Sequence, residues 1–162
     1  MRVIGIDPGT RLCGWGVVEK RGARLTHVAH GTLRLGTGEL ADRLVALERG
    51  LCEVIALHGP EAAAVEALFF AKNAQSAAKL GHARGVVLLA LRRAGLEVGE
   101  YPPARVKGTV VGHGGAAKMQ VGRVVSMMLA LTEMPQEDAA DALAIAITHL
   151  SGASFAAAVK RI

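Results

Sequence analysis

The N-terminal part of the chain alternates between short apolar stretches and polar turns, a pattern typical of β-strands. We predict three consecutive strands at residues 3–7, 13–19 and 25–35. A Pro-Gly-Thr segment at residues 8–10 separates the first two strands, and an Arg-Gly pair at residues 21–22 marks the next turn. Because the turns are short, the three strands are expected to form an antiparallel meander.

After the third strand, the spacing of apolar residues changes to one typical of helices separated by short buried strands. A 4-3-4-4 spacing predicts an amphipathic helix that is closed by Gly59 and has its apolar positions at Leu40, Leu44, Leu47, Leu51 and Ile55. Short apolar runs predict two more strands, at residues 62–66 and 96–101, the second ended by a Pro-Pro pair. Further helices are predicted at residues 73–93, 116–131 and 136–150.

This order of elements predicts an α/β fold. Three antiparallel strands followed by two helix-separated parallel strands indicate a mixed five-stranded sheet with helices on both faces. The same order describes the ribonuclease-H-like architecture, which hosts nucleases, sugar kinases and chaperone ATPases, so the fold alone does not choose a function. With no linker or repeat along the chain, we expect one domain at residues 1–150 and a weakly specified C-terminal tail at residues 151–162.

Composition narrows the class of protein further. The chain has 162 residues, of which 51% are hydrophobic and 20% charged, which excludes disorder as its main state. No apolar stretch approaches the roughly 18–20 residues that a membrane span needs. The N-terminus shows no targeting signal, so a cytoplasmic protein is expected. Cys13 and Cys52 lie in apolar stretches and are expected to be small buried residues, with neither disulfide nor zinc spacing.

Positive charge is concentrated in the middle of the chain. The whole chain has a net charge of +5, whereas residues 67–132 hold nine Lys or Arg against two acids, a net +7. Such a basic region favours a polyanionic partner, because each neutralised phosphate releases condensed counterions. An ordinary solvated basic surface explains the charge equally well.

Two carboxylates follow apolar strands and are the first candidates for chemistry. Asp7 ends the first predicted strand, and Glu66 ends the strand at residues 62–66. The carboxyl ends of parallel strands lie together, and open α/β sheets bind ligands there, so the two acids can share one pocket. Taken singly, Asp7 also fits a turn-forming residue before Pro-Gly, and Glu66 an ordinary surface charge.

A second acidic pair lies near the start of the last predicted helix. Asp138 and Asp141 are three residues apart, which places them on one helical face with about 5–6 Å between their Cβ atoms. Alone, they fit first-turn acids that favour the helix dipole as well as they fit metal ligands. Together with Asp7 and Glu66 they make an oxygen-donor set suited to Mg²⁺. Two such ions can activate water and stabilise the leaving oxygen of a phosphodiester.

Short motifs along the chain resemble, in the same order, those of the RuvC family, the bacterial Holliday junction resolvases. Phe69 also matches a residue of this family. The resemblance runs from about Arg2 to His149. The segments that carry it are 5–10 (GIDPGT), 65–66 (VE), 71–73 (AKN), 76–77 (SA), 79–81 (KLG), 83–86 (ARGV), 106–107 (VK), 110–112 (VVG), 118–121 (KMQV) and 138–144 (DAADALA).

The resemblance implies a ribonuclease-H-like homodimer that cuts four-way junctions with two Mg²⁺ ions, or Mn²⁺ in their place. It implies symmetric nicks in two strands of like polarity, and work with the branch-migration proteins RuvA and RuvB. It assigns catalysis and metal binding to Asp7, Glu66, Asp138 and Asp141. The residues expected at the DNA are Phe69, Lys72, Asn73, Lys79, Arg84, Lys107 and Lys118.

The resemblance also bears on a stripe of small residues along the helix predicted at residues 73–93. The stripe consists of Ala74, Ala78, Gly81 and Gly85, and it fits either a dimer interface or packing on the chain's own sheet. The chain departs from many relatives at His82, where they have Gln, and some relatives have His in place of Asp138. No role is assigned to His82, Phe70 or His113. The rival functions are a junction-binding module without catalysis and a small ATP-binding protein.

Overall fold

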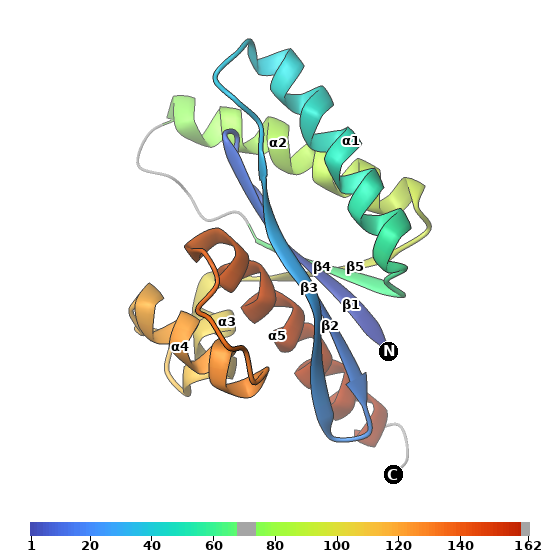
Figure 1. Cartoon of the computed structure of the whole chain (residues 1–162), viewed down its shortest axis with the longest axis vertical. Coiled ribbons are helices and arrows are strands. Elements are labelled where there is room, and N and C mark those ends of the chain that lie inside the picture. Colours follow the sequence, from blue (N-terminus) through green and yellow to red (C-terminus); the bar gives the residue numbers. More distant parts are fainter. Residues whose placement is uncertain (68–73, 160–162) are drawn as a thin grey trace.

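A computed structural model describes residues 1–67 and 74–159, and it contains the predicted five-stranded mixed sheet (Figure 1). The strand order is β3-β2-β1-β4-β5. β1 pairs antiparallel with β2 and parallel with β4, and β4 pairs parallel with β5. The strands are β1 (Arg2–Asp7), β2 (Leu12–Arg21), β3 (Arg24–Arg34), β4 (Ala62–Glu66) and β5 (Glu97–Tyr101).

Helices cover both faces of the sheet, as predicted. In Figure 1, α1 and α2 lie on one side of the sheet, and α3, α4 and α5 lie on the other. Two buried apolar clusters follow from this arrangement, one on each face. The helices are α1 (Leu40–His58), α2 (Ala74–Arg93), α3 (Pro103–Val111), α4 (Lys118–Met128) and α5 (Glu137–Val159).

The region after β5 differs from the prediction. The Pro-Pro pair was expected only to end a strand, yet Pro103 begins α3. Proline is well tolerated in the first helical turn, because the backbone N–H that it lacks has no partner there. Gly112, in the left-handed conformation, ends α3. The helix predicted at residues 116–131 is shorter in the structure, where α4 begins at Lys118 and ends at Met128.

Two smaller predictions also differ from the structure. The last helix does not stop at residue 150 but continues to Val159, through most of the predicted tail. Cys13 is buried as expected, whereas Cys52 is exposed on α1. The sequence around Cys52 is largely apolar, but Cys52 itself lies on the solvent-facing side of α1, beside Glu48 one turn earlier.

The first half of α5 packs unusually close to β1 and β2, because glycines face it. A Cβ atom at Gly5 would collide with the backbone carbonyl of Ala142, and one at Gly14 would collide with that of Asp138. A Cβ at Gly16 would lie 2.7 Å from the side chain of Leu143. The helix backbone therefore lies directly on the sheet, and the position of Asp138 and Asp141 relative to β1 depends on these glycines.

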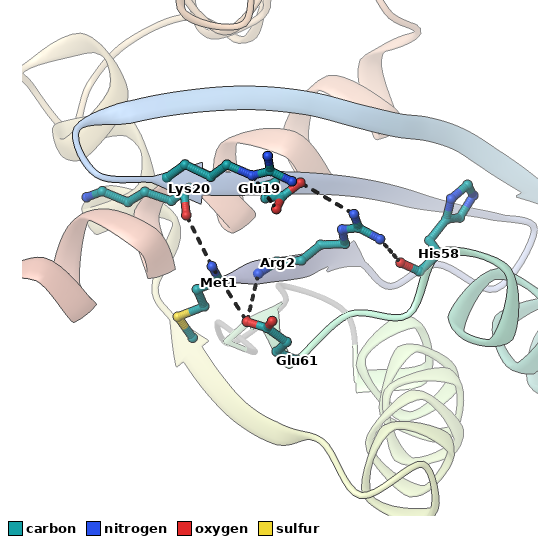
Figure 2. Close-up of polar contacts among 7 residues, drawn as sticks. Met1, Arg2, Glu19, Lys20, His58 and Glu61 are labelled. Atoms are coloured by element: carbon teal, nitrogen blue, oxygen red, sulfur yellow. Dashed lines mark hydrogen bonds and ion pairs between the residues drawn. The ribbon is translucent and has the colours of Figure 1, made fainter.

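Polar contacts around the first two residues anchor the start of β1 (Figure 2). The Met1 ammonium donates a hydrogen bond to the Lys20 carbonyl at 3.1 Å and pairs with the Glu61 carboxylate at 3.6 Å. The Arg2 guanidinium donates to the His58 carbonyl at 2.6 Å, and its backbone N–H donates to Glu61 at 3.1 Å. These contacts tie β1 to β2, to the last residue of α1 and to the segment between α1 and β4.

Replacing Gly5 by alanine tests the close packing of α5. The added methyl group collides with helix backbone, which cannot move as a flexible side chain can. We expect Gly5→Ala to lower the free energy of unfolding by about 3 kcal/mol or more, at the upper end of overpacking effects. Urea unfolding followed by circular dichroism measures the change. Gly38→Ala is the control, since its added Cβ meets nothing within 4 Å; equal stability of the two variants would contradict the close contact.

Candidate active site

Asp7 and Glu66 lie side by side at the carboxyl ends of neighbouring parallel strands. Ile6 of β1 is in register with Val65 of β4, and each acid is the next residue of its strand. Side chains alternate between the two faces of a strand. Because Ile6 and Val65 face the α1–α2 side, both acids face α5. They line one cavity of about 260 Å³.

The last helix brings the other two acids to this end of the sheet. Asp141 lines the same cavity as Asp7 and Glu66. Asp138 lies one turn earlier, over Gly14 of β2, and does not line the cavity. Its negative charge nevertheless acts on Asp7. Three of the four predicted acids thus share a cavity, and the fourth lies outside it but close enough for its charge to act on Asp7.

Burial and mutual repulsion make these carboxylates hard to ionise. Burial, with added repulsion from Glu66, Asp141 and Asp138, raises the pKa of Asp7 to about 7. Burial and the charge of Asp141 raise the pKa of Glu66, and burial raises that of Asp141. A cluster of this kind favours a bound cation, because positive charge relieves both the repulsion and the cost of desolvation.

Two lysines line the same cavity and supply positive charge. Lys118, the first residue of α4, lies 2.6 Å from the Glu137 carboxylate and 3.4 Å from that of Asp141. These contacts raise the pKa of the Lys118 ammonium above its usual range. Lys107 lines the cavity from α3. Lys118 lies on a helix as the sequence predicts, whereas Lys107 lies on α3, which the sequence did not predict.

The acids of the cavity suit a divalent metal by their chemistry. Carboxylate oxygens are the ligands that Mg²⁺ takes. Within residues 1–67 and 74–159, however, no three His, Cys, Asp or Glu side chains lie close enough together to hold a metal ion as placed. The nearest positive charge to Asp141 is instead the Lys118 ammonium. The acids therefore fit a metal by chemistry and by their shared cavity, with a lysine beside them.

Of the other residues predicted at the DNA, three lie outside the part of the chain that the structure describes, and Lys79 and Arg84 lie within it. Phe69, Lys72 and Asn73 lie outside the described residues, as does Phe70. Lys79, on the exposed side of α2, lies beside a shallow hollow next to the start of α1, away from the acids.

Arg84 was expected at the DNA, and the structure shows a contact that the sequence did not predict. Its guanidinium forms an ion pair with Glu100 of β5, and its Nε donates a hydrogen bond to the Glu66 carbonyl at 3.5 Å. Only 14% of the Arg84 side chain is exposed. Arg84 thus supports the end of β4 that carries Glu66, while a DNA contact through it stays a prediction.

Sequence reasoning also missed the apolar wall of the cavity, which Pro103, Val106, Val121 and Ile145 form. The sequence did contain a signal, because Val121 lies three residues after Lys118 and Ile145 four residues after Asp141, which places each pair on one helical face. The two histidines without an assigned role lie outside the cavity. His82, on the exposed side of α2, donates a hydrogen bond of 2.7 Å to the Ala78 carbonyl. His113 is exposed between α3 and α4.

Comparison with known proteins decides the family. The model of the family described as crossover junction endodeoxyribonuclease RuvC matches residues 3–149. The chain belongs to the RuvC family. A RuvC from Sorangium cellulosum is 61% identical over 160 residues, covering 98% of this chain and 89% of that protein.

Solved RuvC structures share the fold. The Thermus thermophilus RuvC structure matches with a TM-score of 0.85 and 38% identity, covering 96% of this chain and 97% of that one. The same protein in complex with a Holliday junction substrate matches with a TM-score of 0.90, covering 96% of both chains. The ribonuclease-H-like prediction is therefore confirmed. Within the described part of the chain, no helix is long and apolar enough to cross a membrane.

The raised pKa of Asp7 predicts how stability depends on pH in metal-free protein. The folded-state pKa of about 7 exceeds the ordinary value of 3.8, so folded protein retains a proton that the unfolded chain releases. The stability that Asp7 contributes is full below about pH 4 and is lost as pH rises through about 7. At about 1.4 kcal/mol per pKa unit, the loss is on the order of 4 kcal/mol.

The measurement compares wild type with Asp7→Asn by urea unfolding in EDTA from pH 4 to 8. We expect the variant to gain stability relative to wild type as pH rises. Asp42→Asn, which changes an exposed acid of α1, should follow wild type at every pH. A constant difference between Asp7→Asn and wild type would show that Asp7 ionises normally.

Proposed function

We propose that this chain is a structure-selective endonuclease that resolves Holliday junctions in recombination and DNA repair. Membership of the RuvC family supports the activity, and the cavity that unites Asp7, Glu66 and Asp141 is the observation that carries it. The likeness to RuvC solved with a Holliday junction substrate supports four-way DNA as the substrate. The products would be symmetric nicks with 5′-phosphate and 3′-hydroxyl ends, in two strands of like polarity.

Asp7, Glu66 and Asp141 would hold Mg²⁺, with Asp138 completing the ligand set and Mn²⁺ able to substitute. Two bound ions supply activation of the attacking water and stabilisation of the leaving oxygen. Asp7 is central to this set, because the charges of all three other acids act on it. The apolar wall formed by Val106 and other side chains lowers the local dielectric, which strengthens attraction between the acids and a cation.

The two cavity lysines would receive the DNA. Lys107 and Lys118 face the acids from α3 and α4, so a phosphate that enters the cavity meets positive charge opposite the carboxylates. The Lys118 ammonium pairs with both Asp141 and Glu137. With a cation held by Asp141, this ammonium would be available to a phosphate oxygen, where it would stabilise the charge that develops during cleavage.

The protein would act as a homodimer through α2. Among the described residues, nothing lies within 4 Å of a Cβ atom built at Gly81 or Gly85, which supports an interface at these positions over packing on the chain's own sheet. Ala83 and Val87 are buried and face the sheet instead. A two-fold dimer would present two active sites to a four-way junction. RuvA and RuvB are the expected partners, in the cytoplasm.

The dimer is tested by sedimentation equilibrium of wild type and Gly85→Gln. Wild type should have twice the 16.8 kDa mass of the chain. The variant should dissociate at least tenfold more readily, because its side chain fills the space that a second helix needs. Gly108→Gln, at another open helical position on α3, is the control. A dimer unaffected by Gly85→Gln would show that α2 is not the interface.

The catalytic assignment is tested with a synthetic four-way junction and a linear duplex of the same sequence, in Mg²⁺, Mn²⁺ or EDTA. We expect paired nicks at the junction with either metal, none with EDTA, and none in the duplex. Asp7→Asn should reduce cutting by at least 10³-fold yet bind the junction as well as wild type or better, because it removes negative charge near phosphate.

The control in that experiment is Asp42→Asn, which should cut normally. Normal cutting by Asp7→Asn would place the catalytic centre elsewhere. Equal cutting of junction and duplex would leave the nuclease but remove its selectivity. Junction binding without any cutting by wild type would favour the rival junction-binding module.

A further inference from the structure

A β-bulge in the edge strand places two histidines on the same face of the sheet. Val17 of β2 is in register with Ala29, and Val18 is in register with His27, so Val28 of β3 is an extra residue without a partner. In a regular strand, residues three apart face opposite sides. The extra residue reverses the alternation, so His27 and His30 both face the side covered by α4 and α5.

Contacts on the partner strand agree with this placement. Val18, opposite His27, belongs to the apolar cluster beneath α5. Gly16, opposite His30, lies against Leu143 of α5. Val28 itself packs into the cluster on the α1–α2 face.

The two imidazole rings converge through their nitrogens. Nε2 of His27 and Nδ1 of His30 form a hydrogen bond of 2.8 Å, in which one ring donates and the other accepts, and the ring centroids are 4.9 Å apart. Burial lowers the pKa of both rings, and the charge of His30 lowers that of His27 further. A neutral imidazole is the form that binds a metal.

The rings border a hollow of about 930 Å³ between the start of β3 and the segment that joins α4 to α5. Its wall includes the carboxylate of Glu133 and the thioethers of Met128 and Met134, all of which can ligate metals. Arg24 is the other charged side chain of the wall, so no excess of positive charge excludes a cation. The hollow has room for an ion that keeps bound water.

We propose that His27 and His30 form a second metal site, separate from the carboxylates, that takes a transition-metal ion such as Zn²⁺. Imidazole nitrogens favour Zn²⁺, Cu²⁺ or Ni²⁺ over Mg²⁺, which takes oxygen ligands. Among the described side chains no third His, Cys, Asp or Glu is close enough to act as a ligand without moving. Water or Glu133 therefore completes the coordination.

Ion binding would replace the hydrogen bond between the two rings. With Zn–N bonds of about 2.0–2.1 Å and tetrahedral angles, two ligating nitrogens lie about 3.3 Å apart. The present spacing is 2.8 Å, so the hydrogen bond would break and both rings would turn until their nitrogens, about half an ångström further apart, face the ion. The bound ion would clamp the bulged part of β3, and a Glu133 ligand would tie this edge strand to the α4–α5 segment.

The test is a Zn²⁺ titration of the full chain carrying Asp7→Asn, which weakens cation binding at the carboxylates. Calorimetry should show one saturable site per chain. In long-range ¹H–¹⁵N spectra, Zn²⁺ should shift the ring nitrogens of His27 and His30 while the other four histidines keep their signals. Mg²⁺ at the same concentrations should shift neither ring.

Substitutions separate this site from surface binding. His27→Gln and His30→Gln should each weaken Zn²⁺ binding at least tenfold, and His82→Gln, at an exposed histidine of α2, should leave it unchanged. Unchanged binding by both β3 variants would overturn the proposal. If either variant fails to fold, the spectra of the chain with both histidines decide it: unshifted His27 and His30 nitrogens at saturating Zn²⁺ would overturn it too.

Discussion

The close contact of α5 with β1 and β2 is the constraint on which the rest of the site depends. Gly5 and Gly14 leave no side chain between sheet and helix, so the backbone of α5 lies against the strands. This contact brings Asp141 into the cavity at which β1 and β4 end. Larger side chains would hold the helix away, and acids from distant parts of the sequence would no longer share one cavity.

That convergence has an electrostatic cost, which the surroundings of the acids offset in part. Burial and repulsion raise the pKa of Asp7, Glu66 and Asp141 together. The protein itself provides positive charge through Lys107 and through the Lys118 ammonium, which is held by Glu137 and Asp141. In the proposed function, metal ions would take the place of this lysine at Asp141, and the lysine would turn toward a phosphate.

The sequence predicted most of the sheet and the shared pocket of Asp7 and Glu66, because strand alternation and strand ends are local features. It missed α3, since a Pro-Pro pair indicates the end of a strand as readily as the first turn of a helix. The pairing of Arg84 with Glu100 depends on how α2 packs against β5, which no local pattern reports. The bulge at Val28 was equally hidden, because the apolar alternation of β3 is weak.

The most direct test of the account is a crystal of the protein soaked with Mn²⁺, measured for anomalous scattering. The account predicts two Mn²⁺ peaks in the cavity, in contact with carboxylate oxygens of Asp7, Glu66 and Asp141, and a Lys118 ammonium displaced from Asp141. Absence of both peaks at saturating Mn²⁺, with Lys118 still paired to Asp141, would contradict the claim that these acids form the metal centre.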